Sequence, residues 1–245
     1  MTITDTTVLV TGANRGIGRA LVEEALNRGA KRVYAGTRQP LTHPDARVVP
    51  LPLDVTDAGQ IRAAVEAVES LDLLINNAGL SLFDDLSDRA LLDRHLAVNL
   101  FGPYTLTQAL LPMLTRTRGA IVNVLSLASI ASVPIFPAYS ISKAAAFSLT
   151  QSLRGMLAGQ GVRVHAVLSG PVDTDMTREL HIPKAAPAAV ARAIFDGVAA
   201  GDEEIFPDPL SAPLAAGWQD SPLKALEREN AALLNLQPLN AEPAA

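Results

Sequence analysis

The 245-residue chain contains no cysteine, and this absence excludes disulfide bonds, thiolate metal ligands and a thiol nucleophile. Aromatic residues are scarce, at 4%. No apolar run approaches the roughly 20 residues that a membrane-spanning helix needs, and residues 1–7 lack the basic and apolar parts of a secretory signal. The formal net charge is −5, so the chain has no overall excess of positive charge that would indicate nucleic-acid binding. We therefore expect a cytoplasmic protein with no membrane or nucleic-acid partner.

Apolar residues, in contrast, are abundant, at 49%, and they follow a regular alternation. Short continuous apolar runs predict strands, and amphipathic runs between them predict helices. The expected strands are at 8–10, 32–35, 48–53, 71–75, 120–125, 162–168 and 204–206. The expected helices are at 17–26, from a cap at Thr56 or Asp57 to about 68, and at 87–115, 139–158 and 187–200. Residues 38–47 are too few for a full helix and include two prolines, so we expect a loop there.

This alternation is typical of a single α/β domain. Apolar strands without a polar face indicate a doubly wound parallel sheet of about seven strands, covered by helices on both faces. We expect the domain to span residues 1–236. The Pro/Asn/Ala-rich segment 237–245 predicts a disordered tail.

A glycine-rich loop follows the first expected strand and opens the first helix. Its residues are Gly12, Ala13, Asn14, Arg15, Gly16, Ile17 and Gly18. Small residues let the backbone approach a pyrophosphate, and a helix N-terminus offers free N–H groups. The spacing matches neither Gly-x-Gly-x-x-Gly nor a P-loop, and glycines at such a turn can be purely structural. Because the loop directly follows the first strand of an alternating chain, we predict a nucleotide site.

Two arginines favour NADP(H) over NAD(H). The second strand ends at Arg38, with no acid to meet a ribose 2′-hydroxyl, whereas an arginine suits a 2′-phosphate. Arg15 in the glycine loop is a second candidate, unless both are ordinary solvated charges. Asp54, followed by Val55, either accepts from the adenine amino group or caps the next helix. The segment Asn76–Gly79 ends the fourth strand at the same sheet edge, where ligands bind in open α/β folds.

Tyr139 and Lys143 are four positions apart at the start of an expected helix, so they share one face. A tyrosine with a pKa of about 10 is a poor base at neutral pH, but a neighbouring ammonium and a cationic nicotinamide would lower that pKa. The pair suits proton transfer with a carbonyl or alcohol, although the same pattern also occurs on ordinary helix faces. Ser126 directly follows the fifth strand and is placed to donate to a substrate oxygen. Asn99 lies inside a helix, where a kink that holds water would supply its amide with partners.

In combination, these motifs resemble those of a classical, non-extended short-chain dehydrogenase/reductase. The matching residues are Thr11-Gly12-x3-Gly16-x-Gly18, Asp54, Asn76-Asn77-Ala78-Gly79, Asn99, Ser126, Tyr139-x3-Lys143 and Gly170-Pro171-x-x-Thr174, and they cover about residues 8–174. The resemblance implies a Rossmann-type fold and hydride transfer with NADP(H). Two features depart from the family. Ser169-Gly170 replaces the usual Pro-Gly, so that turn is less rigid, and the chain from Pro207 lacks the glycine-rich ending of the fatty-acid ketoreductases.

The resemblance also implies residue roles. Tyr139 would exchange a proton with the substrate oxygen, Ser126 would hydrogen-bond that oxygen, Lys143 would bind the nicotinamide ribose, and Asn99 would hold a water that links Lys143 to solvent. Val172 would contact the nicotinamide amide. The expected cofactor-binding residues are Gly12, Asn14, Arg15, Gly16, Ile17, Gly18, Arg38, Asp54, Val55, Asn77, Ala78, Gly79, Tyr139, Lys143, Val172 and Thr174.

The segments after Ser126 and after Thr174 are expected to form the substrate pocket. Its candidate residues are Val133, Ile135, Phe136, Met176 and Leu180. They are apolar, and no anion-binding cluster accompanies them, so we expect a neutral, hydrophobic ketone, aldehyde or secondary alcohol. The four histidines show no metal-binding spacing, and we expect no metal.

Two other functions fit the same motifs: a 3-oxoacyl-(acyl-carrier-protein) reductase and a non-catalytic NADP(H)-sensing protein. The altered ending from Pro207 disfavours the first, and the complete set of catalytic residues disfavours the second. The resemblance to the family implies a homodimer or homotetramer, in which the helices near 87–115 and 139–158 pair across a two-fold axis.

Overall fold

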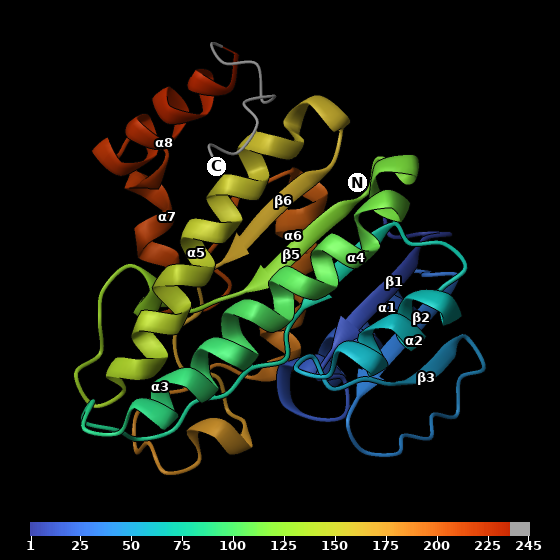
Figure 1. Cartoon of the computed structure of the whole chain (residues 1–245), viewed down its shortest axis with the longest axis horizontal. Helices are drawn as coiled ribbons and strands as arrows, with labels where there is room; N and C mark the ends of the chain where they lie inside the picture. The colour runs from blue at the N-terminus through green and yellow to red at the C-terminus, as the bar shows by residue number, and fades with distance from the viewer. Residues whose placement is uncertain (236–245) are drawn as a thin grey trace, which may run out of the picture.

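A seven-stranded parallel sheet forms the centre of the protein in a computed structural model that describes residues 1–235. The strands are β1 (Thr7–Thr11), β2 (Arg32–Thr37), β3 (Val48–Pro52), β4 (Leu73–Asn76), β5 (Ala120–Val124), β6 (Arg163–Val167) and β7 (Glu204–Ile205). Their order is β3-β2-β1-β4-β5-β6-β7, which confirms the doubly wound prediction (Figure 1). The order reverses between β1 and β4, where such sheets open a binding crevice. The predicted tail at 237–245 and the domain boundary at 236 lie outside the described residues.

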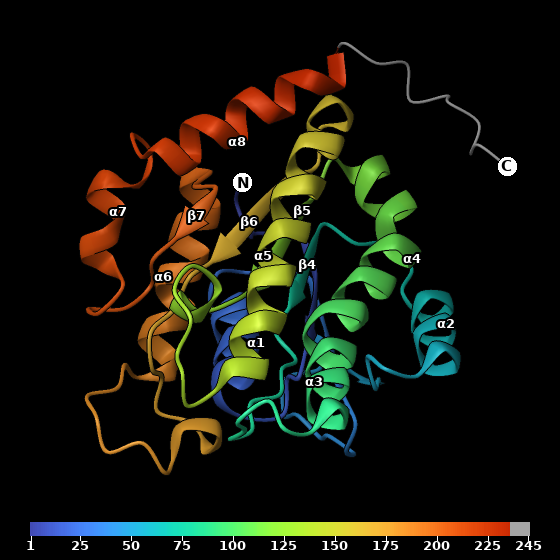
Figure 2. The ribbon, with the colours of Figure 1, turned by 60° about the vertical axis from the view of Figure 1, so that its left-hand side comes forward.

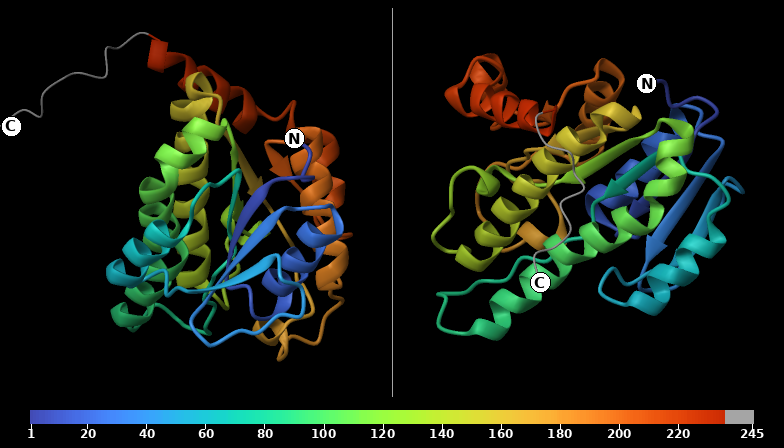
Figure 3. Two further views of the ribbon diagram at one scale, coloured as in Figure 1. Left: turned by 90° about the vertical axis from the view of Figure 1, so that its right-hand side faces the viewer. Right: turned by 45° about the horizontal axis from the view of Figure 1, so that its top comes forward.

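Helices cover both faces of the sheet. They are α1 (Gly16–Asn27), α2 (Ala58–Ala67), α3 (Arg89–Leu96), α4 (Gly102–Thr117), α5 (Pro137–Leu157), α6 (Pro187–Ala200), α7 (Ala212–Trp218) and α8 (Pro222–Ala232). In the edge-on view, α1 and α6 lie on one side and α2, α4 and α5 on the other (Figure 3). The expected loop at 38–47 contains no helix. Within residues 1–235, no helix combines the length and apolarity needed to cross a bilayer.

The two largest clusters of the hydrophobic core lie on opposite faces of the sheet, because alternate strand residues point to opposite faces. Val8 and Val10 of β1 pack in a cluster that includes Phe195 of α6. Leu9, between them, belongs to a second cluster with Leu106 of α4. All five residues of β1 are buried, as both-sided burial of a parallel strand requires.

The single helix expected at 87–115 is wrong in detail, because the structure divides it. Asp88 caps α3 by accepting from the Ala90 backbone N–H at 2.8 Å, so the helix begins at residue 89. A π-helical turn, η1 (Ala97–Phe101), then separates α3 from α4. Pro103 explains the break, since it has no N–H to donate to a carbonyl of the preceding turn. The kink expected around Asn99 is therefore present.

The sequence patterns did not predict α7 and α8, which follow β7. The helix α8 lies across α5 (Figure 2), and a buried ionic cluster fastens it there. The ammonium of Lys224 contacts carboxylate oxygens of Glu203 at 2.6 Å, Glu204 at 2.9 Å and Glu227 at 3.0 Å. Arg154 of α5 shares Glu204 and Glu227. The cluster joins α8 to both β7 and α5, because each element contributes a charged group.

Replacement of Lys224 by methionine should destabilise the fold. Lys224 is 1% exposed and Glu204 is 5% exposed, and breaking a buried ion pair costs about 3–5 kcal/mol because the remaining charge is left uncompensated. Urea unfolding measures the change in free energy. The control is Arg228→Met, since Arg228 lies exposed on the same helix and should change the stability by less than about 0.5 kcal/mol. A Lys224→Met variant as stable as the wild type would contradict the assignment.

Candidate active site

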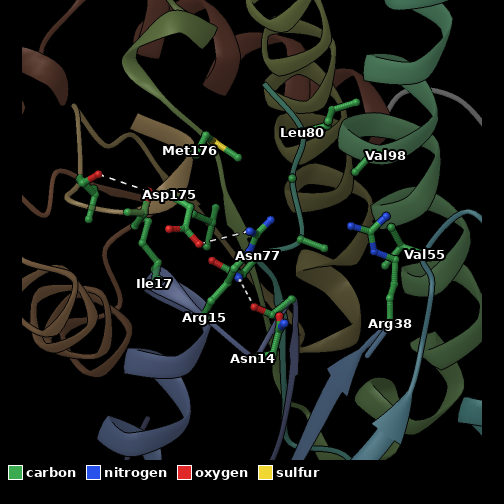
Figure 4. A pocket seen from close by; sticks show the side chains of 18 of the residues that line it. Asn14, Arg15, Ile17, Arg38, Val55, Asn77, Leu80, Val98, Asp175 and Met176 are labelled. Carbon is green, nitrogen blue, oxygen red and sulfur yellow. Dashed lines mark hydrogen bonds and ion pairs between the residues drawn. The ribbon is translucent and has the colours of Figure 1, made fainter. Parts of the chain in front are cut away.

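A cleft of about 660 Å³ opens at the carboxyl edge of the sheet. It brings together nearly all predicted cofactor and catalytic residues. Asn14, Arg15, Arg38 and Asn77 are among the lining residues labelled in Figure 4. The predicted residues that line it are Gly12, Asn14, Arg15, Gly16, Ile17, Gly18, Arg38, Asp54, Val55, Asn77, Ala78, Gly79, Ser126, Tyr139, Lys143, Val172, Thr174 and Met176. Residues that the sequence analysis missed also line it, including Leu80, Arg94 and Val98. Leu80 follows Gly79 directly and Val98 precedes Asn99 directly, so those motifs are the available signal for both, whereas Arg94 has no motif beside it.

The glycine loop forms the floor of this cleft. Gly12 has φ +66° and Gly16 has φ +53°, a left-handed conformation that favours glycine. A Cβ on Gly12 would lie 3.1 Å from the Ala78 Cα, and one on Gly18 only 2.0 Å from the Gly12 carbonyl oxygen. Arg15 precedes α1 without a side-chain hydrogen bond to it, which leaves the first N–H groups of the helix available to an anion. The loop therefore fits a phosphate group.

Thr11 joins the glycine loop to the end of β4. Its hydroxyl oxygen accepts from the backbone N–H groups of Asn77 at 3.0 Å and Ala78 at 2.9 Å. The Asn77 side-chain amide returns a hydrogen bond to the Thr11 carbonyl oxygen at 2.8 Å. These contacts hold the two sides of the crevice at a fixed separation.

The two arginines of the predicted phosphate site have different surroundings. Arg38 lies exposed at the end of β2 and lines the cleft beside Val55 (Figure 4). Arg15 contacts Asp175, with 3.3 Å between Nη1 and Oδ2, and Asp175 also pairs with Arg178. Arg38 is thus the better placed of the two to meet a new anion, because Arg15 already has a carboxylate partner.

The structure decides between the two roles left open for Asp54. Asp57 caps α2, since its Oδ1 accepts from the backbone N–H groups of Gly59 at 2.8 Å and Gln60 at 3.0 Å. Asp54 instead accepts from the Thr56 backbone N–H at 2.9 Å. The capping role for Asp54 is therefore wrong, and its place in the cleft wall keeps the adenine contact as a prediction.

The first turns of α5 direct Tyr139 and Lys143 into the cleft, where Ser126 meets them from the end of β5. The Lys143 Nζ lies 5.8 Å from the centroid of the Tyr139 ring and donates to the Val124 carbonyl oxygen at 2.8 Å. The Ser126 hydroxyl accepts from the Ala128 backbone N–H at 3.1 Å. The three side chains thus share one wall of the cleft, as the spacing predicts.

Burial dominates the titration of this pair. It raises the pKa of Tyr139, and a hydrogen bond with Ser126 acts in the opposite direction without reversing that shift. Burial also lowers the pKa of Lys143 to about 8. In the protein by itself, the pKa of Tyr139 is therefore not lowered, and the lowering expected from the ammonium together with a cationic nicotinamide stays a prediction. The physical reason is that both groups are removed from water, and desolvation disfavours the phenolate more than its neighbours favour it.

Asn99 lies in η1 and is 2% exposed. Its side-chain nitrogen donates to the Leu80 carbonyl oxygen at 2.8 Å and to the Ser142 hydroxyl at 2.9 Å, and its Oδ1 accepts from the Leu80 N–H at 2.8 Å. The amide thus finds its partners in the protein rather than in water. Ser142 was missed, although its place beside Lys143 in the sequence is the available signal.

A small second cavity, of about 10 Å³, lies beside Asn99 and Lys143. Asn76 also lines it, and the buried Oδ1 of Asn76 makes no hydrogen bond within the described residues. A volume of roughly 10–15 Å³ accepts one water molecule when polar groups line it. The cavity therefore fits a single water next to the Lys143 side chain.

Only Met176 of the five predicted substrate residues lines the main cleft; it lies in η4 (Asp175–Thr177). The other four, Val133, Ile135, Phe136 and Leu180, do not line it in the part of the chain described. Phe136 stacks on Phe83, with the ring centroids 4.5 Å apart. Val133 and Ile135 are exposed because their segment extends beyond the cleft edge. Their contact with a substrate stays a prediction.

Similarities to known proteins agree with this geometry. The family model described as short chain dehydrogenase matches residues 6–184. The chain is 35% identical over 201 residues to 2-(S)-hydroxypropyl-CoM dehydrogenase 3 of Xanthobacter autotrophicus, covering 76% of this chain and 79% of the relative. It is 34% identical over 219 residues to ketoacyl reductase HetN of Nostoc sp., covering 80% and 76%. The crystal structure of a short chain dehydrogenase from Burkholderia cenocepacia J2315 in complex with NADP matches with a TM-score of 0.84 and 35% identity, covering 97% of this chain and 100% of that chain.

The lowered pKa of Lys143 predicts a pH-dependent stability. The folded pKa is about 8 and an unfolded lysine titrates at about 10.4, so between these values the unfolded chain binds more protons and folding gains stability as pH rises. From about pH 7.5 to about pH 9.5, the unfolding free energy of the wild type should rise by about 2 kcal/mol relative to that of Lys143→Met. Urea unfolding at both pH values measures it. Lys31→Met is the control, because Lys31 is exposed; an equal change for both variants would contradict the prediction.

Proposed function

Because the chain belongs to the short-chain dehydrogenase/reductase family of oxidoreductases, which act on CH–OH and C=O groups, we propose that it is an NADPH-dependent carbonyl reductase or secondary alcohol dehydrogenase. The proposed substrate is a neutral, hydrophobic ketone or aldehyde. One observation carries the proposal: Ser126, Tyr139 and Lys143 line the same cleft as the glycine loop. A phosphate site and a proton-transfer group within one cleft are what hydride transfer to a carbonyl requires.

Tyr139 is the general acid of the proposed reduction. Burial raises its pKa, so it carries its proton at neutral pH and can give it to the carbonyl oxygen. Ser126 donates a hydrogen bond to the same oxygen and stabilises the charge that develops there. The nicotinamide, when bound, supplies or accepts the hydride. In alcohol oxidation, Tyr139 removes the hydroxyl proton, and proximity of the Lys143 ammonium favours that step.

Lys143 is proposed to supply protons to Tyr139, and Asn99 to help hold a water that links Lys143 to solvent. With a pKa of about 8, the Lys143 ammonium is mostly charged at neutral pH and is a proton donor of suitable strength. The cavity beside it supports the proposed water, since Asn76 offers an unused acceptor oxygen there. In this arrangement Asn99 positions the helix turn and the Leu80 backbone around the water.

The cofactor is proposed to be NADP(H) rather than NAD(H). Arg38 lines the cleft at the end of β2, and a guanidinium matches the geometry of a 2′-phosphate. The Burkholderia cenocepacia structure, which is 35% identical to this chain, is a complex with NADP. Asn14, Ile17 and Thr174 would line the remainder of the cofactor site.

A neutral, apolar substrate is supported by the charges around η4. Asp175 pairs with both Arg15 and Arg178, so the two cations of this wall already have partners. Met176, beside them, presents an apolar side chain that is 49% exposed. Leu180 and the exposed apolar residues of segment 133–136 would extend this surface when a substrate binds.

A second candidate function is reduction of a β-ketoacyl thioester. The ketoacyl reductase HetN of Nostoc sp., 34% identical to this chain, favours it. The C-terminal segment that forms α7 and α8 replaces the glycine-rich ending of the fatty-acid ketoreductases, which disfavours an acyl-carrier-protein substrate. Comparison of free ketones with a thioester substrate separates the two candidates.

The protein is also proposed to form a homodimer or homotetramer through α4 and α5. Their outward residues support this pairing, because the exposed side chains include Tyr104 on α4 and Ile141 on α5. Large apolar side chains on a helix face favour burial against a second copy.

Replacement of Tyr139 by phenylalanine should abolish turnover while NADPH binding survives. Loss of a general acid costs about 10²–10⁴ in rate, whereas the ring that packs in the cleft wall remains. Steady-state kinetics gives kcat, and fluorescence titration gives the NADPH dissociation constant. Tyr34→Phe is the control, since Tyr34 lies in β2 and does not line the cleft. Activity close to wild type in Tyr139→Phe would defeat the catalytic assignment.

Replacement of Arg38 by aspartate should weaken NADPH binding far more than NADH binding. The change removes a cation from the proposed 2′-phosphate site and adds an anion, so the expected loss for NADPH is about 100-fold or more. Dissociation constants for both cofactors measure it. Arg116→Asp makes the same charge change at an exposed site on α4 and should affect both cofactors slightly and equally. Equal losses of NADPH and NADH in Arg38→Asp would remove the case for the phosphate contact.

A further inference from the structure

Asp208 is a buried carboxylate that follows β7 and is only 5% exposed. Its Oδ2 accepts from the Gly170 backbone N–H and from the Ser211 hydroxyl, both at 2.8 Å. Its Oδ1 accepts from the backbone N–H groups of Leu210 and Ser211, both at 3.1 Å. The four donors are neutral dipoles, and such hydrogen bonds to an ionised acceptor are among the strong ones.

The Gly170 end of this contact belongs to the cofactor cleft. Gly170, Val172 and Thr174 all line the cleft in the segment that follows β6. The pairing of β6 with β7 continues past the strands, since the Leu168 N–H donates to the Ile205 carbonyl oxygen at 2.8 Å. Two residues after Leu168, the Gly170 N–H donates to the Asp208 side chain instead of to a backbone carbonyl, which continues this series of hydrogen bonds. The carboxylate therefore controls where the chain turns into the cleft wall.

Glycine at position 170 makes this contact possible. A Cβ there would lie 2.8 Å from the Asp208 Oδ1 and 3.1 Å from the Leu210 Cδ2. A side chain at Gly170 would push the carboxylate away from the backbone N–H that it accepts from. The position of the Asp208 carboxylate thus depends on the absence of a side chain at residue 170, although 38 positions separate the two residues in the sequence.

Ser169 stands where the family usually has proline. A proline ring fixes φ and stiffens a turn, so the serine leaves this turn in need of another restraint. We propose that Asp208 is a positioning residue that supplies this restraint and holds segment 169–174 in the geometry that the cofactor needs. Asp208 lies beyond residues 6–184, which the family model matches. Asp208 does not itself line the cleft, whereas Gly170 does, so the carboxylate would act through the Gly170 backbone.

Asparagine is the sharpest test of this role because it keeps the size of the side chain. Each carboxylate oxygen receives two donors, and an amide has only one oxygen. With the amide NH₂ in the place of Oδ2, the Gly170 N–H faces another donor and is released. With the amide oxygen in that place, the Gly170 N–H keeps an acceptor that is no longer charged, and the N–H groups of Leu210 and Ser211 face the NH₂. The hydrogen bond of the Gly170 N–H is therefore lost in the first orientation and weakened in the second.

The experiment compares wild type, Asp208→Asn and Lys224→Met by hydrogen–deuterium exchange without cofactor and by NADPH titration. In Asp208→Asn, the amides of segment 168–174 should exchange at least about tenfold faster, and the NADPH dissociation constant should rise about tenfold. Lys224→Met is the control for a general loss of stability. Because that loss speeds exchange throughout the protein, the exchange of segment 168–174 is scored relative to that of β1, and this ratio and the NADPH dissociation constant should stay at their wild-type values.

Ser211→Ala provides a second variant in case Asp208→Asn does not fold. It removes the hydroxyl donor to Oδ2 and leaves the Gly170 contact with a less restrained carboxylate, so segment 168–174 should exchange about two- to threefold faster. Unchanged exchange in both variants, or the same increase in Lys224→Met, would overturn the proposal. The inference rests on the proposed cofactor site only for the NADPH readout. Wild-type protein that fails to bind NADPH would refute that site, and the exchange rates would still decide the role of Asp208.

Discussion

The close approach of two backbone segments, at the point where the strand order reverses, determines the remainder of the site. The loop after β1 meets the loop after β4 so tightly that a Cβ on Gly12 would lie 3.1 Å from the Ala78 Cα. Thr11 fixes this distance by accepting two backbone N–H groups of the opposite loop. The chain leaves β1 toward one face of the sheet and β4 toward the other, so the crevice between them stays open. Because the sheet is parallel, Ser126 after β5 and Gly170 after β6 arrive at the same edge.

The proposed proton transfer uses two neighbouring groups whose pKa values burial shifts in opposite directions. Burial lowers the pKa of Lys143 and raises that of Tyr139, which means that the charged form of each group is disfavoured in the folded protein. The Val124 carbonyl oxygen, which accepts from the Lys143 Nζ, offsets part of that cost. Such opposed shifts of neighbouring groups are characteristic of sites that transfer protons.

The features that the sequence predicted correctly are those that depend on residues close together in the chain. The alternation of strands and helices followed from apolar periodicity, and the pairing of Tyr139 with Lys143 followed from their helical spacing. The break in the helix expected at 87–115 had a local signal in Pro103, but the partners of Asn99 did not, because they lie on the distant Leu80 backbone. The contact of Asp208 with Gly170 required β7 to be placed beside β6. Substrate contacts were the least predictable, since Val133 and its neighbours lie on a segment that extends away from the cleft.

We propose that the cleft binds NADPH and a neutral, hydrophobic carbonyl compound and reduces that compound. The most direct test follows the absorbance of the reduced nicotinamide with NADPH and with NADH, against hydrophobic ketones, aldehydes and a β-ketoacyl thioester. We expect turnover of free ketones or aldehydes, with NADPH preferred over NADH. Turnover of the thioester alone, or NADPH binding without turnover of any of these compounds, would contradict it.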